Sequence, residues 1–373
     1  MYKIEIENNV THQKYTYDNV EDKNNGKKLF YNFNLDTSNL DDGEYTLSLY
    51  DGNNLITSEL LKIGDFNNKT IQYSKGSNVY IDAKPTKIDV ANEGIKLGNS
   101  TFTEIPVVFD FSNVTDMYGM FHSCSNLKTI PLIDTSNVTN MESMFSGCSK
   151  LTTIPQLNTS NATRMDYMFY NCTKLQSIPL LECGNVTNMS HMFYNCTKLQ
   201  SIPLIDTSNV TNMFRMFFHC RSLQSIPLLD TSNVTDMQLM FYNCSTLQSI
   251  PLLDTSNVTI MSSMFSNCSS LQSIPLLDCS KVKYMSSMFG SSDNTTLTEI
   301  GGFKNLKISV TSNFLDKAPN LTVDSLMNVI NYLYDLTSNG LSGQSLNFGQ
   351  TNLDKLSAEQ IAVATAKGWT LIA

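Results

Sequence analysis

The sequence predicts a mixed α/β chain in three parts: a small N-terminal β-sandwich, a repeat solenoid of eight 24-residue turns and a C-terminal αβ cap. Three observations lead to this prediction. Residues 112–300 repeat with a fixed period, residues 1–64 alternate between apolar and polar side chains, and residues after 320 carry longer apolar patterns. The 373 residues are enough for more than one domain.

The solenoid is predicted from a motif, Met-x-x-Met-Phe, that recurs every 24 residues. It begins at Met117, Met141, Met165, Met189, Met213, Met237, Met261 and Met285. An Ile-Pro pair recurs in the same register from Ile130 to Ile274. One such turn cannot bury its own apolar side chains, so neighbouring turns must cover them in a stack.

Each turn is predicted to contain a helix followed by a short strand. In one copy, the helical spacing is carried by Val186, Met189, Met192, Phe193 and Cys196. The preceding Asp, Thr, Ser and Asn residues are typical of a helix N-cap. The spacing of Leu199, Ile202 and Leu204 then indicates a strand, which Pro203 would shorten because proline has no N–H to donate.

Residues 1–64 are predicted to form a sandwich of about five strands. Alternation appears at residues 2–6, 13–17, 29–35, 44–50 and 55–63. Turn dipeptides separate several of them, including Asp42-Gly43 and Asp51-Gly52. We expect residues 1–64 to be an anchoring module, 65–102 a linker and N-terminal cap, 103–300 the solenoid and 301–373 the capping turns.

The C-terminal cap is predicted from a change of register and from capping signals. Ser292 takes the position of the repeated cysteine, and two residues are inserted before Leu297. A helix is expected around 326–336, a strand at 345–348 and a last strand at 369–371. Ser357 and Gln360 have the spacing of a capping box, which predicts a helix that ends near Gly368.

Seven of the nine cysteines stand in one register of the repeat. They are Cys124, Cys148, Cys172, Cys196, Cys220, Cys244 and Cys268. A ladder spreads these thiols along a line, whereas a metal site needs ligands that converge on a point. We therefore expect small buried core residues, with disulfides and then zinc as the lesser alternatives. Cys183 and Cys279 replace a threonine and are expected to be more exposed. No cofactor is expected.

Charge and hydropathy limit the classes of partner. The net charge is -9 and no Lys/Arg cluster is present, which argues against nucleic acid as the main partner. No apolar run is long enough to predict a transmembrane helix. The first residues lack the basic and apolar segments of a secretory signal, so we expect no export by that route.

Candidate binding residues lie in the columns that vary between turns. The helical spacing would place the two residues inside Met-x-x-Met in solvent, and the residue after Phe is aromatic in the central turns. The candidates are Tyr167, Tyr170, His191, Tyr194, Phe214, Arg215, Phe218, Leu239 and Tyr242. Aromatic side chains on rigid turns can anchor a protein or stack on a sugar. The alternatives are unconstrained surface variation and cover for the flank of the core.

Two further columns are uniform. A Gln-Ser pair, such as Gln200-Ser201, would give a polar strand face that could bind a repetitive glycan, although recent duplication explains it equally. An Asn column forms Asn-x-Thr sequons at 137, 161, 185, 209, 233 and 257. We interpret it as helix caps or as a hydrogen-bond ladder between turns.

The repeat resembles the BspA-type leucine-rich-repeat surface proteins of bacteria. The resemblance rests on the pattern Asp-Thr-Ser-Asn-Val-Thr-x-Met-x-x-Met-Phe over residues 103–300. It implies a leucine-rich-repeat solenoid, a role in adhesion and no enzymatic activity. The family usually has a longer segment where this chain has residues 202–206, which leaves the strand and corner geometry open.

Two terminal segments resemble virion proteins of gut bacteriophages, of the crAss-like kind. The N-terminal one is Asp41-Asp42-Gly43-Glu44-Tyr45 to Gly52 with residues 60–65, and the C-terminal one runs from Asn352 to Trp369. The resemblance implies a virion protein.

We therefore expect a non-enzymatic binding protein, a virion-attached adhesin or fibre that displays its solenoid to a host-surface protein or glycan. Residues 1–64 would bind other virion or surface proteins. The alternatives are a bacterial cell-surface adhesin and a structural decoration protein of a virion. Oligomerisation stays open. An enzyme is not expected, because the four histidines, His12, His122, His191 and His219, lie in different turns and columns and no catalytic motif is present.

Overall fold

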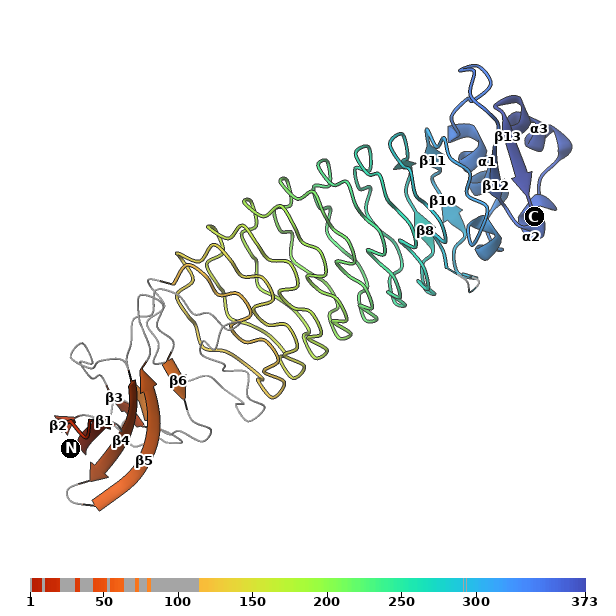
Figure 1. Ribbon diagram of the computed structural model, residues 1–373. Coiled ribbons are helices and arrows are strands. Elements are labelled where there is room, and N and C mark those ends of the chain that lie inside the picture. The colour runs from red at the N-terminus through yellow and green to blue at the C-terminus, as the bar shows by residue number, and fades with distance from the viewer. Residues whose placement is uncertain are drawn as a thin grey trace.

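The structure is a computed structural model that describes residues 2–8, 11–20, 31–33, 43–51, 54–63, 71–73, 79–81, 114–290, 292 and 294–373. Figure 1 shows the turns of the solenoid stacked side by side into a rod, which ends in a cap of helices and strands at the C-terminus. The predicted beginning of the solenoid at residues 103–113 lies outside the described residues.

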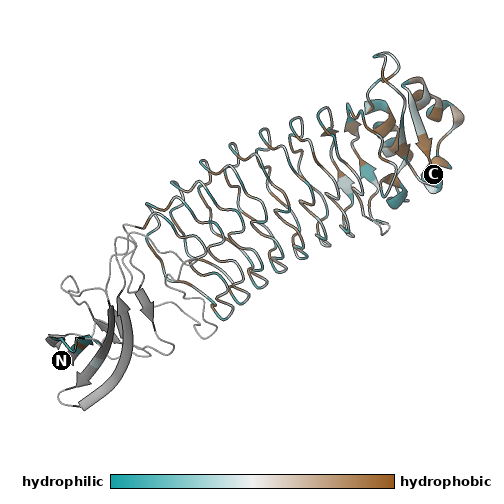
Figure 2. Ribbon diagram, viewed as in Figure 1, coloured by the Kyte–Doolittle hydropathy of each residue, from teal (hydrophilic) through white to brown (hydrophobic). Residues whose placement is uncertain are grey.

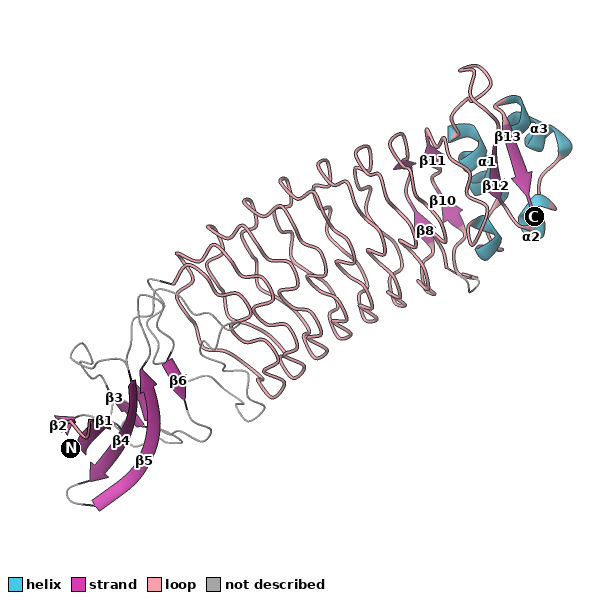
Figure 3. Cartoon of the chain, viewed as in Figure 1, coloured by secondary structure: helices cyan, strands magenta, loops and turns pink. Residues whose placement is uncertain are grey.

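The helix predicted in each turn is wrong. Residues 114–290 contain no helix in the structure, and Figure 3 draws them almost entirely as loops. Two residues of each turn lie in the left-handed region, as His191 (φ 58°) and Asn195 (φ 58°) do, and a right-handed helix cannot pass through them. Because each of these residues redirects the chain, the apolar side chains still return to one side at a helix-like spacing.

Backbone hydrogen bonds run between turns instead of along a helix. Alternate N–H groups donate to the carbonyls of the following turn. The N–H of Met189 donates to Asn212 O (3.0 Å), that of Phe193 to Met216 O (2.9 Å) and that of Asn195 to Phe218 O (2.7 Å). This parallel ladder fixes a 24-residue register and places each residue beside its equivalent in the next turn.

The core is a set of identical columns. Val186, Met189, Met192, Phe193 and Cys196 are fully buried, as are almost all their equivalents. The phenylalanines form one stack from Phe121 to Phe289, with ring centroids 5.3–6.5 Å apart. Figure 2 shows apolar and polar residues alternating along every turn. Each buried apolar side chain contributes roughly 1.5–3 kcal/mol, and neighbouring turns supply the cover.

The strand face differs from the prediction. Regular strands are limited to the last turns, where β8 (Ser273–Ile274) pairs in parallel with β10 (Glu299–Ile300), and β9 (Leu277–Asp278) with β11 (Phe303–Lys304). The spacing of Ile202 and Leu204 suggests one buried face, but Leu204 is exposed and Ile205 is buried in its place. The alternation of buried and exposed residues therefore shifts by one residue after Pro203.

All nine cysteines are free and buried. In the main register the thiol donates to a carbonyl of the preceding turn, as Cys172 Sγ does to Phe145 O (3.1 Å). The expected exposure of Cys183 and Cys279 is wrong. The threonine at their position, such as Thr207, is itself buried and donates to the next turn. At Cys183 and Cys279 a thiol therefore occupies a position where the other turns bury a threonine hydroxyl.

The N-terminal strands form a five-stranded antiparallel sheet. Its order is β2-β1-β4-β5-β6, and a separate parallel pair joins β3 to β7. The bounds are β1 Tyr2–Asn8, β2 Lys14–Val20, β3 Tyr31–Phe33, β4 Gly43–Asp51, β5 Asn54–Ile63, β6 Ile71–Tyr73 and β7 Val79–Ile81. The first five coincide with the predicted strands. Their arrangement as a sandwich is not confirmed, and β6 and β7 fall within the predicted linker.

The C-terminal cap contains the two helices and two strands that were predicted, together with two short helices, η1 and α2, that were not. The described elements are η1 (Leu315–Lys317), α1 (Val323–Tyr332), β12 (Gln344–Asn347), α2 (Gln350–Leu353), α3 (Ala358–Ala366) and β13 (Trp369–Ile372). The capping box of Ser357 and Gln360 begins α3 as predicted. Strands β12 and β13 pair in parallel, and Trp369 is buried. The cap thereby covers the apolar end of the stack.

We predict that Phe193→Ala lowers the free energy of unfolding by about 3–5 kcal/mol, because it opens a cavity in the middle of the phenylalanine stack. Leu204→Ala, at an exposed leucine of the same turn, should change it by less than about 0.5 kcal/mol. Urea unfolding followed by circular dichroism measures both. Equal effects of the two substitutions would contradict the assignment of core and surface.

We also predict that the native protein resists thiol alkylation. Burial raises the pKa of Cys183 and of Cys268 to about 12, so these thiols form little thiolate, and all nine thiols are inaccessible to a reagent. Iodoacetamide followed by intact-mass spectrometry should show no adduct on the folded chain and nine adducts after denaturation. Modification of the folded chain at Cys183 or Cys279 would show that their burial is wrong.

Candidate functional site

Eight of the nine predicted site residues gather in one patch on four adjacent turns. Two columns build it. The inner column lies just before the second Met and holds Tyr167, His191, Arg215 and Leu239. The outer column lies just after the Phe and holds Tyr170, Tyr194, Phe218 and Tyr242. Phe214 lies beside the inner column. We call the eight of these residues that make ring contacts, which are all but Leu239, together with His219 the aromatic patch. Leu239 is half-buried in the inner column, and no described ring contact includes it.

The outer column is a continuous stack of rings. Tyr170, Tyr194, Phe218 and Tyr242 lie with successive centroids 4.6 Å apart and interplanar angles of 16°, 5° and 7°. This spacing is shorter than in the buried phenylalanine stack and close to the distance between hydrogen-bonded neighbouring chains. Tyr194 and Phe218, in the middle of this stack, have a neighbouring ring on both faces, so each presents its edge to solvent.

The inner column adds a buried imidazole and a cation. His191 stacks on Tyr167 (4.3 Å) and meets Phe214 edge to face (5.0 Å). It is only 7% exposed, and its Nδ1 has no hydrogen-bond partner. The Arg215 guanidinium lies over the rings of Phe214 (4.8 Å) and Phe218 (5.3 Å). Arg215 is therefore the positive charge of the patch.

The same four turns carry large side chains at a left-handed backbone position. The inner column lies in the left-handed region in every turn, with φ of 59° at Tyr167, 58° at His191, 56° at Arg215 and 58° at Leu239. The flanking turns place small residues at this position: Gly119, Ser143, Ser263 and Ser287. Any residue other than glycine at such a φ costs of order 1–3 kcal/mol, so the serines share this cost and only the size of the side chain differs. The outer column changes in step, with Ser146 and Ser266 on either side of the rings.

The solvent position predicted for the residues inside Met-x-x-Met is only partly correct. Tyr167, Phe214 and Arg215 are half-exposed, whereas His191 is buried, as are Asp166 and Ser190. That prediction assumed helical geometry. His219, which stacks on Phe218 (4.4 Å), was missed because it stands in a column of Asn residues. Its neighbour Phe218 was the one available signal.

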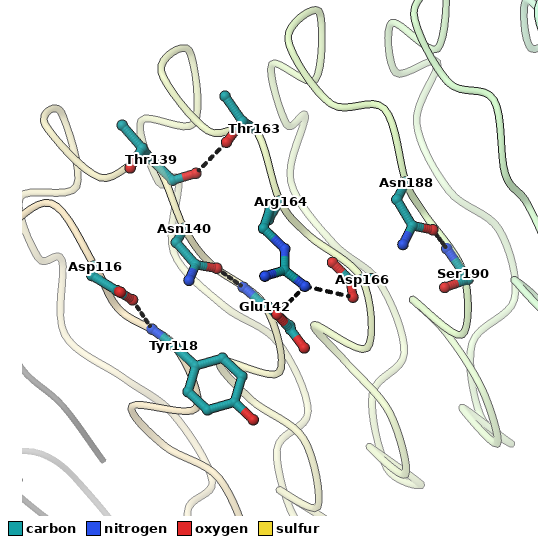
Figure 4. A network of polar contacts seen from close by, with 10 residues as sticks. All are labelled: Asp116, Tyr118, Thr139, Asn140, Glu142, Thr163, Arg164, Asp166, Asn188 and Ser190. Carbon is teal, nitrogen blue, oxygen red and sulfur yellow. Dashed lines mark hydrogen bonds and ion pairs between the residues drawn. The ribbon is translucent and has the colours of Figure 1, made fainter. Parts of the chain in front are cut away.

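A charged network borders the patch. In most turns the residue three positions before the inner column is Asn or Asp, and its side chain accepts a backbone N–H. Asn140 Oδ1 accepts from Glu142 N (3.1 Å), and Asn188 Oδ1 accepts from Ser190 N (2.9 Å). Arg164 takes this position once, and it pairs with Glu142 and with Asp166 (3.4 Å), as Figure 4 shows. Burial and the Asp166 carboxylate raise the pKa of Glu142, and Arg164 opposes the shift.

The uniform columns have structural roles. Asn161 Nδ2 donates to Ser136 O (2.7 Å), Asn185 to Ser160 O (2.8 Å) and Asn209 to Gly184 O (2.7 Å). The interpretation of the sequon column as a ladder between turns is thus confirmed. Most of the Gln-Ser pairs are exposed, as Gln200 and Ser201 are. Among the residues that the structure describes, no three metal-ligating side chains converge, and no helix is long and apolar enough to cross a membrane.

Fold and site together define a leucine-rich-repeat-type solenoid with a surface patch of stacked aromatic rings. The model of one family matches residues 95–203, 187–303 and 248–327, which together span more than half of the chain. The protein therefore belongs to the family described as "Mycoplasma protein of unknown function, DUF285". This membership supports the resemblance to bacterial leucine-rich-repeat proteins, but it does not bear on the resemblance to phage proteins. No curated protein matches the chain.

Three solved structures share a weak likeness. The TLR13–ssRNA13 complex is 15% identical with a TM-score of 0.25, over 68% of this chain and 41% of that one. The Toll–Spatzle complex of Drosophila is 15% identical with a TM-score of 0.26, over 84% and 45%. The plant peptide hormone receptor RGFR1 in complex with RGF2 is 14% identical with a TM-score of 0.16, over 69% and 53%. The chain spans less than two thirds of each, and TM-scores this low carry no argument about ligands.

We predict that His191 makes stability depend on pH. Burial, and then Arg215, lower the pKa of His191 from 6.5 to about 4. In the unfolded chain the pKa returns to its ordinary value, so between these pH values the unfolded state binds more protons. Stability is therefore full above about pH 6.5 and falls as the pH drops towards about 4.

His191→Ser should remove this part of the pH dependence, since Ser143 and Ser263 occupy the same column with the same backbone. Urea unfolding at both ends of the window measures it. Some dependence should remain, because burial also lowers the pKa of His219. An unchanged loss of stability in the variant would contradict the burial of a neutral His191.

Proposed function

We propose that this chain is a non-enzymatic binding protein and that the aromatic patch is its recognition surface for a protein partner. One observation carries the proposal. On the same four turns, two columns replace Gly and Ser with large side chains, and one of them does so at left-handed φ angles. The core columns of these turns are almost unchanged, with Ala162 for Val and Cys183 for Thr as exceptions, so packing does not require the substitutions. Large, partly exposed aromatic and Arg side chains that the core does not require are typical of an interaction surface.

The geometry of the rings favours a protein over a glycan. A sugar stacks on the face of an aromatic ring, but the faces of Tyr194 and Phe218 are covered by their neighbours at 4.6 Å. The ring edges, the tyrosine hydroxyls and the Arg215 guanidinium remain for contact. Such half-exposed Tyr, Phe and Arg side chains on a rigid scaffold are the usual anchors of protein interfaces. The preorganised stack also loses little entropy on binding.

We further propose that the chain acts at a surface, as a virion-attached adhesin or fibre for host attachment. This rests on the resemblance of the terminal segments to virion proteins and on the family's resemblance to surface proteins. A bacterial cell-surface adhesin and a virion decoration protein are the alternatives. In a decoration protein the aromatic patch would be packed against other subunits. Immunogold labelling of purified virions and of cell envelopes with an antibody against the patch separates the three.

We predict that Tyr170→Ser/Phe218→Ser/Tyr242→Ser weakens partner binding by more than about tenfold, because aromatic anchors contribute about 2 kcal/mol or more each. Serine is matched to this column, where Ser146 and Ser266 already stand. The measurement is flow cytometry of the fluorescently labelled full chain on a panel of intact bacteria. Protease treatment of the cells should abolish binding, and periodate oxidation of their glycans should not.

Tyr284→Ser is the matched control, since Tyr284 is an exposed ring outside the patch. It should bind like the unmodified chain, and circular dichroism should show all variants folded. Unchanged binding of the triple variant would exclude the aromatic patch as the site. Sensitivity to periodate, with resistance to protease, would replace the protein partner with a glycan.

A further inference from the structure

A row of exposed leucines runs along the solenoid outside the aromatic patch. Each follows the proline of an Ile-Pro pair. The exposed fractions are 70% at Leu132, 53% at Leu180, 63% at Leu204, 62% at Leu228 and 65% at Leu252. Single exposed leucines are ordinary, but a continuous line of them on a rigid surface is typical of an interaction site. The row is unbroken from Leu180 to Leu252, the same four turns that carry the aromatic patch.

An acidic row runs beside the leucines. Two residues after each of these four leucines lie Glu182, Asp206, Asp230 and Asp254, all exposed. Residues two apart on an extended chain point the same way, so the two rows share one face. Hydrogen bonds from the Ser208 backbone and side chain lower the pKa of Asp206, and Ser232 does the same for Asp230. These carboxylates are therefore charged over a wide range of pH.

Both rows change together where they are interrupted. In one turn Gln156 stands in the leucine row and Asn158 in the acidic row. A surface hollow of about 630 Å³ opens there, and Leu132, Gln156 and Glu182 are among its lining residues. Asn158 Oδ1 still accepts from the Ser160 N–H (3.1 Å) and Oγ (2.7 Å), as an aspartate does. The local backbone thus needs neither the leucine nor the charge.

At the C-terminal end of the two rows, groups of this same chain contact the leucine position and the acidic position. In the last turns Leu276 is only half-exposed, and Gly302 and the Tyr332 ring of α1 lie close to it. A Cβ added to Gly302 would lie 3.3 Å from Leu276 Cδ1 and 2.9 Å from the Tyr332 ring. Asp278 pairs with Lys304 across 3.5 Å. An apolar group from the cap therefore lies at the leucine row, and an ammonium group at the acidic one.

We propose that Leu180, Leu204, Leu228 and Leu252, with the acidic row, form a second docking surface for a partner polypeptide that carries a line of apolar side chains flanked by Lys or Arg. Apolar burial would supply affinity, and the charges would fix orientation. A second copy of this chain fits less well, because it would bring one acidic row close to another. In each turn the exposed Gln-Ser pair separates this surface from the aromatic patch.

The test uses two synthetic peptides, one alternating leucine and lysine and one alternating leucine and glutamate, titrated into the full chain by fluorescence anisotropy. The leucine-lysine peptide should bind more than about tenfold more tightly. Leu204→Gln/Leu228→Gln should weaken it by more than about tenfold. Asp206→Asn/Asp230→Asn should weaken it and flatten its salt dependence. Gln156 and Asn158 show that both substitutions suit the fold.

Glu299→Gln/Asp324→Asn is the charge-matched control, since both carboxylates are exposed but lie outside the rows. This control and the triple variant of the aromatic patch should bind the leucine-lysine peptide normally. Equal binding of the two peptides would show that the acidic row plays no part, and equal weakening by the control would show general charge attraction. Either result would overturn the proposal. Self-association in sedimentation that Leu204→Gln/Leu228→Gln abolishes would also overturn it, because the occupant would be a second copy.

Discussion

The backbone ladder between turns is the constraint on which the rest of this structure depends. Alternate N–H groups, such as those of Met189 and Phe193, donate to the following turn and hold a register of 24 residues. Each side chain therefore lies beside its own equivalent, so the protein is organised in columns more than in helices and sheets. A column of phenylalanines becomes a stack, and a column of asparagines becomes a hydrogen-bond ladder. A substituted side chain must therefore pack against the residues at the same position in the two neighbouring turns.

Two left-handed residues per turn make this register possible, and they explain what the sequence could not predict. Val186, Met189, Phe193 and Cys196 have the spacing of an amphipathic helix, and the same spacing arises when the chain is folded back twice in ten residues. The repeated Asn of the second position, as at Asn195, was a usable signal, because Asn tolerates a positive φ. The first left-handed position offered no such signal in the central turns, because Tyr, His, Arg and Leu stand there instead of Asn or Gly.

The sequence predicted the period, the buried columns and the C-terminal cap, because each follows from local spacing and capping chemistry. It also grouped the aromatic residues correctly, since a repeat places equal positions side by side whatever the turn looks like. The sequence could not predict how individual side chains are oriented. Whether His191 is buried, whether rings show a face or an edge, and whether Leu204 or Ile205 points inward all depend on backbone angles. The strands of residues 1–64 were likewise predicted, but how they pair depends on contacts between distant residues.

The outer surface of the solenoid divides into lengthwise rows of different chemistry, and this division follows from the columns. Around one turn lie aromatic Tyr194, cationic Lys198, the neutral pair Gln200-Ser201, apolar Leu204 and anionic Asp206, all at least partly exposed. The core requires none of these six residues, since the turn with Ser146, Gln156 and Asn158 replaces most of them without loss of register. A rod of this kind separates stability from recognition. The inner columns must stay uniform because every turn packs on the next, whereas an outer column can change over a few adjacent turns and form a site of matching length. The four turns in which Gly and Ser give way to large residues show such a change, and the core columns do not require it.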